Sequence, residues 1–170
     1  MLLAQRQEVS PEVRARLDER IARHAWDWWR ASGVHSIGVY WPMRGEPDLR
    51  ALYARLHAQG VQLALPLVVG KDAALAFAVW QPGDALQRDA FGCAVPGPLA
   101  RPARPQALLI PCVGFNARNQ RLGYGGGFYD RTLAQTPRPA AIGIAYAAGA
   151  CEFAGDEHDI ALDRVITEEG

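Results

Sequence analysis

Four glycines stand among the five residues from 123 to 127, directly before a segment with helical character, Phe128 to Gln135. Glycine has no Cβ atom, so this backbone can adopt positive φ angles and bring successive N–H groups close to an oxyanion. The start of the helix adds free amides and a partial positive charge. The run therefore predicts a phosphate-binding loop.

Charged residues flank this glycine run. Asp130 falls in the first turn of the predicted helix, where its carboxylate can hold a metal ion against a phosphate, and Arg121 and Arg131 bracket the run with cations. A purely structural turn is the alternative, with Asp130 complementing the helix dipole and Tyr129 in the core. The flanking charges favour a nucleotide-binding site.

The overall composition restricts the partners of such a site. The formal net charge is zero, which argues against nucleic acid or an acidic membrane surface as a partner. Lys71 is the single lysine among the 18 basic residues. A Walker-type lysine is absent after the glycines, where Gly126, Gly127 and Phe128 occupy the candidate positions. Arginine and backbone N–H groups must therefore supply the charge for any phosphate.

The three cysteines, Cys93, Cys112 and Cys151, form no C-x-x-C pair, so neither a disulfide scaffold nor a zinc site is expected. An apolar setting such as that of Cys112 favours a core role over a catalytic thiol. The sequence has no charged-then-apolar leader and no apolar run of 18 residues. We expect a soluble, cytoplasmic protein.

Helical and strand patterns alternate along the chain, which is typical of α/β folds. Helices are expected over 11–32, 47–59 and 128–135, and strands over 35–41, 61–65, 73–80, 107–111, 140–146 and 164–167. The segment 83–106 is rich in proline and glycine and is predicted to be a surface loop that can act as a lid. One α/β domain over residues 1–170 would place the glycine run at the carboxyl end of strand 107–111, where open α/β sheets bind ligands.

From Leu108 to Arg131 the sequence LLIPCVGFNARNQRLGYGGGFYDR resembles the 5-formyltetrahydrofolate cyclo-ligases, also called methenyltetrahydrofolate synthetases. Segments 41–46 (WPMRGE), 60–66, 91–96 and 158–167 resemble other parts of the family in the same order. The resemblance covers most of the chain, and the RLGYGGGFYDR block is its most specific part.

The resemblance implies a three-layer α/β/α fold with a mostly parallel or mixed central sheet, similar to NagB and RpiA. It also implies ATP and Mg²⁺ as requirements. The implied reaction converts 5-formyltetrahydrofolate to 5,10-methenyltetrahydrofolate with release of ADP and phosphate, through phosphorylation of the formyl oxygen. The expected partners are the reduced folate and ATP, without nucleic acid or membrane, and we expect a monomer.

The resemblance also implies roles for individual residues. Arg121 and Asp130 would be catalytic, and Asp130 would ligate magnesium. The expected ATP-binding residues are Arg6, Arg121, Leu122, Gly123, Tyr124, Gly125, Gly126, Gly127, Phe128, Tyr129 and Asp130. Glu46 would bind the folate through its pterin N–H groups, with Trp41 and Met43 lining the pterin slot. From the residues alone, Glu46 fits a helix N-cap and Trp41 and Met43 fit core packing equally well.

Four features depart from the family pattern. Arg6 is the only basic residue in the first segment, where the family carries a lysine as well. Val95 replaces a glutamate, Asn116 stands where the family has Phe-Asp, and Ala148 lies where a glutamine is usual. These differences leave two alternatives open: a nucleotide- or folate-binding paralogue without turnover, and a phosphotransferase with another acceptor.

Overall fold

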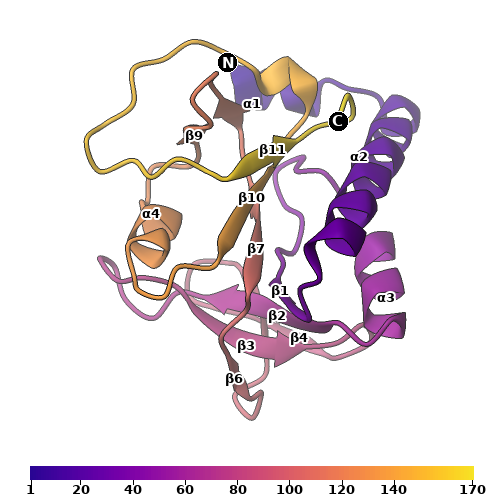
Figure 1. The fold of residues 1–170 in the computed structure, drawn as a ribbon, viewed down its shortest axis with the longest axis vertical. Coiled ribbons are helices and arrows are strands. Elements are labelled where there is room, and N and C mark those ends of the chain that lie inside the picture. The colour runs from indigo at the N-terminus through magenta and orange to yellow at the C-terminus, as the bar shows by residue number, and fades with distance from the viewer.

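A mixed sheet of seven strands forms the centre of the protein, and the computed structural model describes all residues from Met1 to Gly170. From one edge to the other the strands are β11 (Arg164–Ile166), β10 (Ala140–Ile144), β7 (Ala107–Pro111), β1 (Ser36–Gly38), β2 (Gln62–Leu67), β3 (Ala76–Trp80) and β6 (Pro102–Ala103) (Figure 1). The first five are parallel, and β3 and β6 are antiparallel to their neighbours. The expected sheet is confirmed.

Helices cover both faces of this sheet. Helices α2 (Pro11–Ser32) and α3 (Arg50–Ala58) lie on one face and α4 (Phe128–Leu133) on the other (Figure 1). Side chains of a strand alternate between faces, so Leu109 of β7 joins the apolar cluster under α2 and α3, while Leu108 and Ile110 join the cluster with Leu133 of α4. The three-layer architecture predicted from the sequence is therefore confirmed.

Helix α2 has the predicted bounds because both of its ends carry strong signals. Ser10 Oγ accepts a hydrogen bond from the Val13 N–H, and Pro11 occupies the first helical position. Gly33 ends the helix in the left-handed conformation with φ of 71°.

Several other predicted bounds are wrong. Helix α3 begins at Arg50 and not at 47, because the Asp48 carboxylate accepts the Arg50 N–H and holds the preceding residues outside the helix. Strand β1 ends at Gly38, β3 begins at Ala76, and α4 ends at Leu133. Strand β2 continues through Pro66, where β1 no longer pairs with it and no hydrogen bond is lost on that side. Strand β10 ends at Ile144 and β11 at Ile166.

The segment 83–106 is not the structureless loop that was expected. It folds into a hairpin of β4 (Leu86–Arg88) and β5 (Ala94–Pro96) and continues into β6. Val95 is buried in this hairpin. The strands are two or three residues long, so their apolar alternation is too short to stand out in the sequence.

Three further elements complete the chain. Helix α1 (Leu2–Gln7) was not predicted, and the strands β8 (Gly114–Phe115) and β9 (Arg121–Leu122) form a hairpin that links β7 to the glycine run. A short 3₁₀ helix, η1 (Ala147–Gly149), follows β10. None of the helices combines the length and the apolar character needed to cross a membrane.

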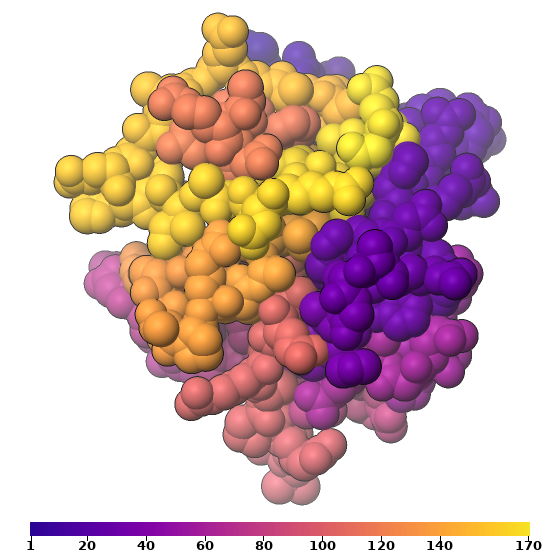
Figure 2. All heavy atoms as spheres, viewed as in Figure 1, coloured from indigo at the N-terminus to yellow at the C-terminus, as the bar shows by residue number.

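The buried carboxylate of Asp18 joins three parts of the fold. Its Oδ1 accepts a hydrogen bond of 2.5 Å from the Tyr146 hydroxyl beyond β10, and its Oδ2 accepts one of 3.2 Å from the Asp48 N–H before α3. Helix α2 is thereby fixed against the segment that follows β10. In Figure 2 the C-terminal residues (yellow) lie beside α2 (indigo to violet) on the visible surface.

Tyr146→Phe should lower the free energy of unfolding by about 1–3 kcal/mol, because it leaves a buried carboxylate oxygen without its donor. Urea unfolding at neutral pH measures the change. The control is Glu19→Gln, an exposed residue next to Asp18 on α2, which should change the free energy by no more than about 0.5 kcal/mol. Equal stability of the Tyr146 variant and the wild type would contradict a structural role for this hydrogen bond.

Candidate active site

A cleft of about 1010 Å³ lies at the carboxyl ends of the central strands. The neighbouring parallel strands β1 and β7 create it, because the chain leaves β1 towards α3 on one face and leaves β7 towards α4 on the other. Such a divergence opens a crevice between the two connections. The cleft contains the expected nucleotide-loop and folate-side residues Glu46, Trp41, Met43, Arg121, Leu122, Gly123, Tyr124, Gly125, Gly126, Gly127, Phe128, Tyr129, Asp130 and Arg131.

The glycine run, residues 123–127, forms the loop between β9 and α4. Gly125 and Gly127 have φ angles of 90° and 68°, which disfavour any other residue. A Cβ atom on Gly123 would lie 2.5 Å from Nη2 of Arg121, so this part of the loop rests directly on the guanidinium group. The glycines therefore allow the backbone both to turn and to approach a cation.

Arg121 is fixed from two sides below this loop. Its Nη2 donates a hydrogen bond of 3.0 Å to the Pro111 carbonyl at the end of β7, and its guanidinium carbon lies 5.2 Å from the centre of the Tyr129 ring. The Nε atom is buried and has no partner. Arg121 is thus a fixed cation whose Nε–H has no acceptor. It belongs to strand β9 and not to the glycine run.

Arg131 lies on the other side of the loop. It stacks over Phe128 at 5.6 Å and forms an ion pair of 3.5 Å with the exposed Asp72. The pair of arginines predicted to bracket the glycine run is therefore present, one held below the loop and one at its edge.

Glu46 is a buried acid that also lines the cleft, on the segment after β1, with 5% of its surface exposed. Its Oε1 accepts the Met43 N–H at 3.0 Å, and its Oε2 accepts the Tyr124 hydroxyl at 3.1 Å. Burial raises the pKa of the Glu46 carboxyl above its usual value, while these hydrogen bonds and the charges of Arg6 and Arg121 act to lower it. The helix-cap alternative is wrong, because α3 begins four residues later, at Arg50.

Trp41 and Met43 both face the cleft. The Trp41 ring also packs edge-on against Trp80, with the ring centres 6.0 Å apart, and the Arg50 guanidinium covers it at 5.1 Å. Trp41 is therefore a rigid apolar wall and a part of the core packing at once. Its part in core packing is confirmed, and its role in lining a pterin slot stays a prediction.

Arg6 is brought to the glycine loop from α1 and is 7% exposed. Its Nη2 donates to the Tyr124 hydroxyl and to the Arg44 carbonyl, both at 2.7 Å, whereas Nε and Nη1 are buried without partners. Arg6 is not among the residues that line the cleft. Its hydrogen bond to Tyr124, which lines the cleft, connects it to the site.

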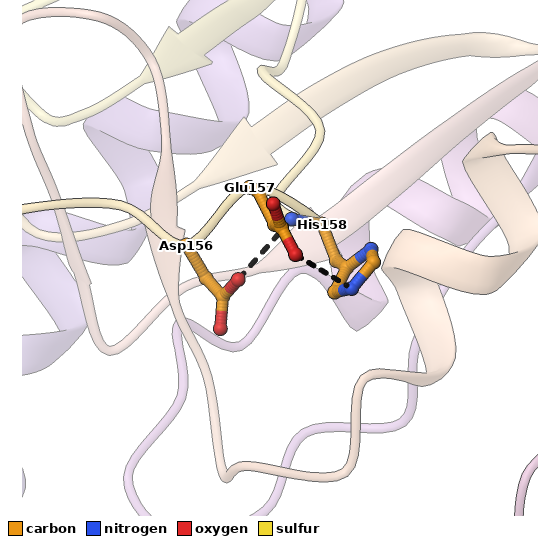
Figure 3. Close-up of side chains that lie close together, drawn as sticks. All are labelled: Asp156, Glu157 and His158. Carbon is orange, nitrogen blue, oxygen red and sulfur yellow. Dashed lines mark hydrogen bonds and ion pairs between the residues drawn. The ribbon is translucent and has the colours of Figure 1, made fainter.

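Asp130 lies at the edge of the cleft beside the C-terminal segment. One of its oxygens, Oδ1, accepts the Ile160 N–H at 3.1 Å, which leaves Oδ2 available. Asp156 and His158 of the same segment also line the cleft. Figure 3 shows the exposed Asp156, Glu157 and His158, whose ligand atoms lie within 4.8 Å of one another. Sequence reasoning did not assign these residues, although the acidic run from 156 to 159 marks them.

The β4–β5 hairpin contributes two residues that the sequence did not assign to the site. Phe91, at the tip of the hairpin, is 59% exposed, and Cys93 is half-buried beside it. Burial raises the pKa of the Cys93 thiol, which disfavours the reactive thiolate form. The exposed ring of Phe91 stands at the mouth of the cleft.

Three of the departures from the family pattern lie outside the cleft wall. Val95 is buried in the β4–β5 hairpin, and Ala148 is exposed in η1. Asn116 closes the turn between β8 and β9, where its Oδ1 accepts the N–H groups of Arg118 and Gln120 at 3.0 Å each. The polar residues that face the cleft are thus unaffected by these three differences.

Comparison with known proteins gives one consistent result. The model of the 5-formyltetrahydrofolate cyclo-ligase family matches residues 1–168. A 5-formyltetrahydrofolate cyclo-ligase of Escherichia coli K12 is 29% identical, over 98% of this chain and 96% of its own. One from Mycoplasma pneumoniae is 46% identical over 69 residues, which are 40% of this chain and 42% of that protein.

A solved structure supports the same relationship. The 5,10-methenyltetrahydrofolate synthetase of Mycoplasma pneumoniae superimposes with a TM-score of 0.82 and 26% identity, over 98% of this chain and 94% of the other. Family model, relatives and fold agree over nearly the whole length, so the chain belongs to the 5-formyltetrahydrofolate cyclo-ligase family.

Proposed function

We propose that this protein is an ATP-dependent enzyme that converts 5-formyltetrahydrofolate to 5,10-methenyltetrahydrofolate and releases ADP and phosphate. The family membership supports this proposal. The observation that carries it is that a single cleft contains both a glycine loop resting on Arg121 and the buried carboxylate of Glu46. The loop suits phosphate groups, and the carboxylate suits the N–H groups of a pterin.

The reaction needs activation because a formamide carbonyl is a poor electrophile. In the first step the formyl oxygen attacks the γ-phosphorus of ATP, and the bond to the β-phosphate oxygen breaks to release ADP. In the second step the neighbouring amine nitrogen of the folate attacks the formyl carbon and loses its proton, while the carbon–oxygen bond breaks to release phosphate. Phosphoryl transfer of this kind depends mainly on positioning and charge stabilisation.

The residues at the loop end of the cleft would supply those two effects. The N–H groups of residues 123–127 donate no hydrogen bond within the protein and can meet phosphate oxygens. Arg121 lies directly beneath with a fixed charge and an unused Nε donor. The ring of Tyr129 holds Arg121 from the side, and burial raises the pKa of its hydroxyl, so Tyr129 stays neutral. We assign the γ-phosphate to this end of the cleft.

The side of the cleft formed by the segment after β1 would hold the reduced folate. Glu46 offers carboxylate oxygens to the pterin N–H groups, Trp41 provides a flat apolar face of the kind that a ring system needs, and Met43 adds a further apolar contact. The exposed ring of Phe91 at the cleft mouth can cover the bound folate and exclude water. The two substrates would then lie side by side, because Tyr124 of the glycine run donates a hydrogen bond to Glu46.

The residues present also suit a magnesium ion. Mg²⁺ prefers oxygen ligands and is usually held by one or two carboxylates together with substrate phosphates. Asp130 has an unengaged Oδ2 at the edge of the cleft, and the carboxylate of Asp156 lines the same cleft. We propose Asp130 as the main ligand, with Asp156 beside it. The bound ion would neutralise the charge that develops on the phosphates.

Purified protein with 5-formyltetrahydrofolate and Mg-ATP should produce methenyltetrahydrofolate, followed as growing absorbance, with one ADP formed per product. Omission of either substrate is the control. ATP binding without product would contradict the proposal and favour the binding paralogue without turnover. ADP formation without methenyltetrahydrofolate would contradict it in favour of a phosphotransferase with another acceptor.

Asp130→Asn should lower kcat/KM for Mg-ATP by roughly 10²-fold, which is similar to the cost of removing one electrostatic stabiliser of a transition state. The fold should survive, because the asparagine oxygen can still accept the Ile160 N–H. Asp27→Asn is the matched control, since Asp27 is exposed on α2 and does not line the cleft. Unaltered turnover at every magnesium concentration would refute the metal role of Asp130.

Glu46→Gln should raise the KM for the folate by tenfold or more and leave the KM for ATP nearly unchanged, because only the charged acceptor is lost. The variant and the wild type should also differ in how their stability depends on pH. Burial raises the pKa of Glu46 above its unfolded value, so the wild type loses stability as pH rises through that pKa, whereas glutamine does not ionise.

The stability of the Glu46→Gln variant relative to the wild type should therefore increase from pH 4.5 to pH 8 in urea unfolding. Glu8→Gln, at an exposed position, is the control and should show no such trend. A larger effect on the KM for ATP than on the KM for the folate would contradict the assignment of Glu46 to folate binding.

A further inference from the structure

The three side chains of Arg6, Tyr124 and Glu46 form a continuous hydrogen-bonded chain, of which Tyr124 and Glu46 line the cleft. Arg6 Nη2 donates to the Tyr124 hydroxyl at 2.7 Å, and that hydroxyl donates to Glu46 Oε2 at 3.1 Å. The chain joins α1, the glycine loop and the segment after β1, which are far apart in the sequence. We propose that Tyr124 is a positioning residue for folate binding: together with Arg6 it orients the Glu46 carboxylate and keeps it ionised. This inference rests on the proposed function.

The direction of the hydrogen bonds in this chain is fixed by chemistry. A guanidinium group only donates, and an ionised carboxylate only accepts. The Tyr124 oxygen must therefore accept from Arg6, and its single proton must point to Glu46. A hydrogen bond from the Tyr124 hydroxyl is stronger to an ionised carboxylate than to a protonated carboxyl group. The arrangement thus favours the ionised form of Glu46.

Tyr124 is held from two directions. Arg6 fixes its hydroxyl, and the Arg44 guanidinium covers its ring at 4.6 Å. The carbonyl of Arg44 in turn accepts a hydrogen bond from Arg6 Nη2. The hydroxyl is therefore placed in advance of binding, which reduces the entropy lost when Glu46 meets a ligand.

The burial of Arg6 has no explanation in stability alone. Two of its nitrogens, Nε and Nη1, are buried and unpartnered, which is a cost to folding. Its charge acts to lower the pKa of Glu46, as does that of Arg121, against the upward effect of burial. A cation that is costly to bury and close to an essential acid fits a role in holding that acid ionised.

Other titratable groups also face Glu46 but carry no charge near neutral pH. Burial raises the pKa of each of them, so they remain protonated: Tyr40, Tyr53, Cys93, Cys112 and Tyr129. The ionisation of Glu46 is therefore controlled by Arg6 on α1, Arg121 on β9 and the hydrogen bonds from Tyr124 and Met43.

Tyr124→Phe tests the role directly, because it removes one oxygen atom and keeps the ring under Arg44. Calorimetric binding of 5-formyltetrahydrofolate at pH 7 should show a Kd about tenfold higher than that of the wild type, the loss typical of a hydrogen bond to a charged group. The KM for ATP should stay within about twofold. In addition, the fall of kcat/KM for the folate on the acidic side of its pH profile, here called the acid limb, should occur at a higher pH than in the wild type.

A double-mutant cycle separates action through Glu46 from a merely structural effect. If Tyr124 acts through Glu46, Tyr124→Phe should change folate affinity little in a Glu46→Gln background. Arg6→Met provides a second variant that keeps the volume and removes the charge, and it should shift the acid limb in the same direction. Thermal unfolding of each variant verifies that it is folded.

An enzyme that forms product but has the same folate Kd and the same pH profile with Tyr124→Phe would overturn the inference and leave the proposed function intact. Additive effects in the double-mutant cycle would also overturn it. Failure of the wild type to form product, with folate binding that still depends on Tyr124, would instead contradict the proposed reaction and support the positioning role.

Discussion

The divergence of the chain from two neighbouring parallel strands is the constraint on which the rest of the structure depends. Strand β1 leads to α3 on one face, and β7 leads to α4 on the other, so neither helix covers the space between their carboxyl ends. Both connections must cross this space with polar backbone that no strand or helix satisfies. Segment 41–46 and the glycine loop are those crossings, and a ligand with acceptors and donors can complete them.

Glu46 shows how function opposes stability in this cleft. A buried carboxylate loses hydration and recovers only part of it from two hydrogen bonds. The protein adds two arginines near it and leaves buried nitrogens of both without partners. Each of these features is unfavourable in isolation. Together they make a charged acceptor that is already desolvated when a pterin arrives, so binding need not strip water from it.

The sequence predicted the parts of the molecule that depend on local signals. Helix α2 has the expected bounds because Ser10, Pro11 and Gly33 act within a few residues, and β7 has them because five consecutive residues are buried on both faces. The hairpin in segment 83–106 and the placement of Arg121 in β9 could not be read in this way, because two-residue and three-residue strands are stabilised by their partners instead of by their own pattern. The residue types of the site were assigned, but the contact of Arg6 with Tyr124 joins positions 118 residues apart.

The near absence of lysine acquires a physical explanation in the cleft. Three arginines there lie over aromatic rings: Arg44 on Tyr124, Arg121 on Tyr129 and Arg131 on Phe128. A planar guanidinium group can be held by its face while the N–H groups at its edge stay available, whereas a lysine ammonium has no such face. An arginine held by a carboxylate would have its charge neutralised before any phosphate arrived. For Arg44 and Arg121, stacking on Tyr124 and Tyr129 instead fixes the cation and leaves most of its charge for the ligand, whereas Arg131 also pairs with the exposed Asp72.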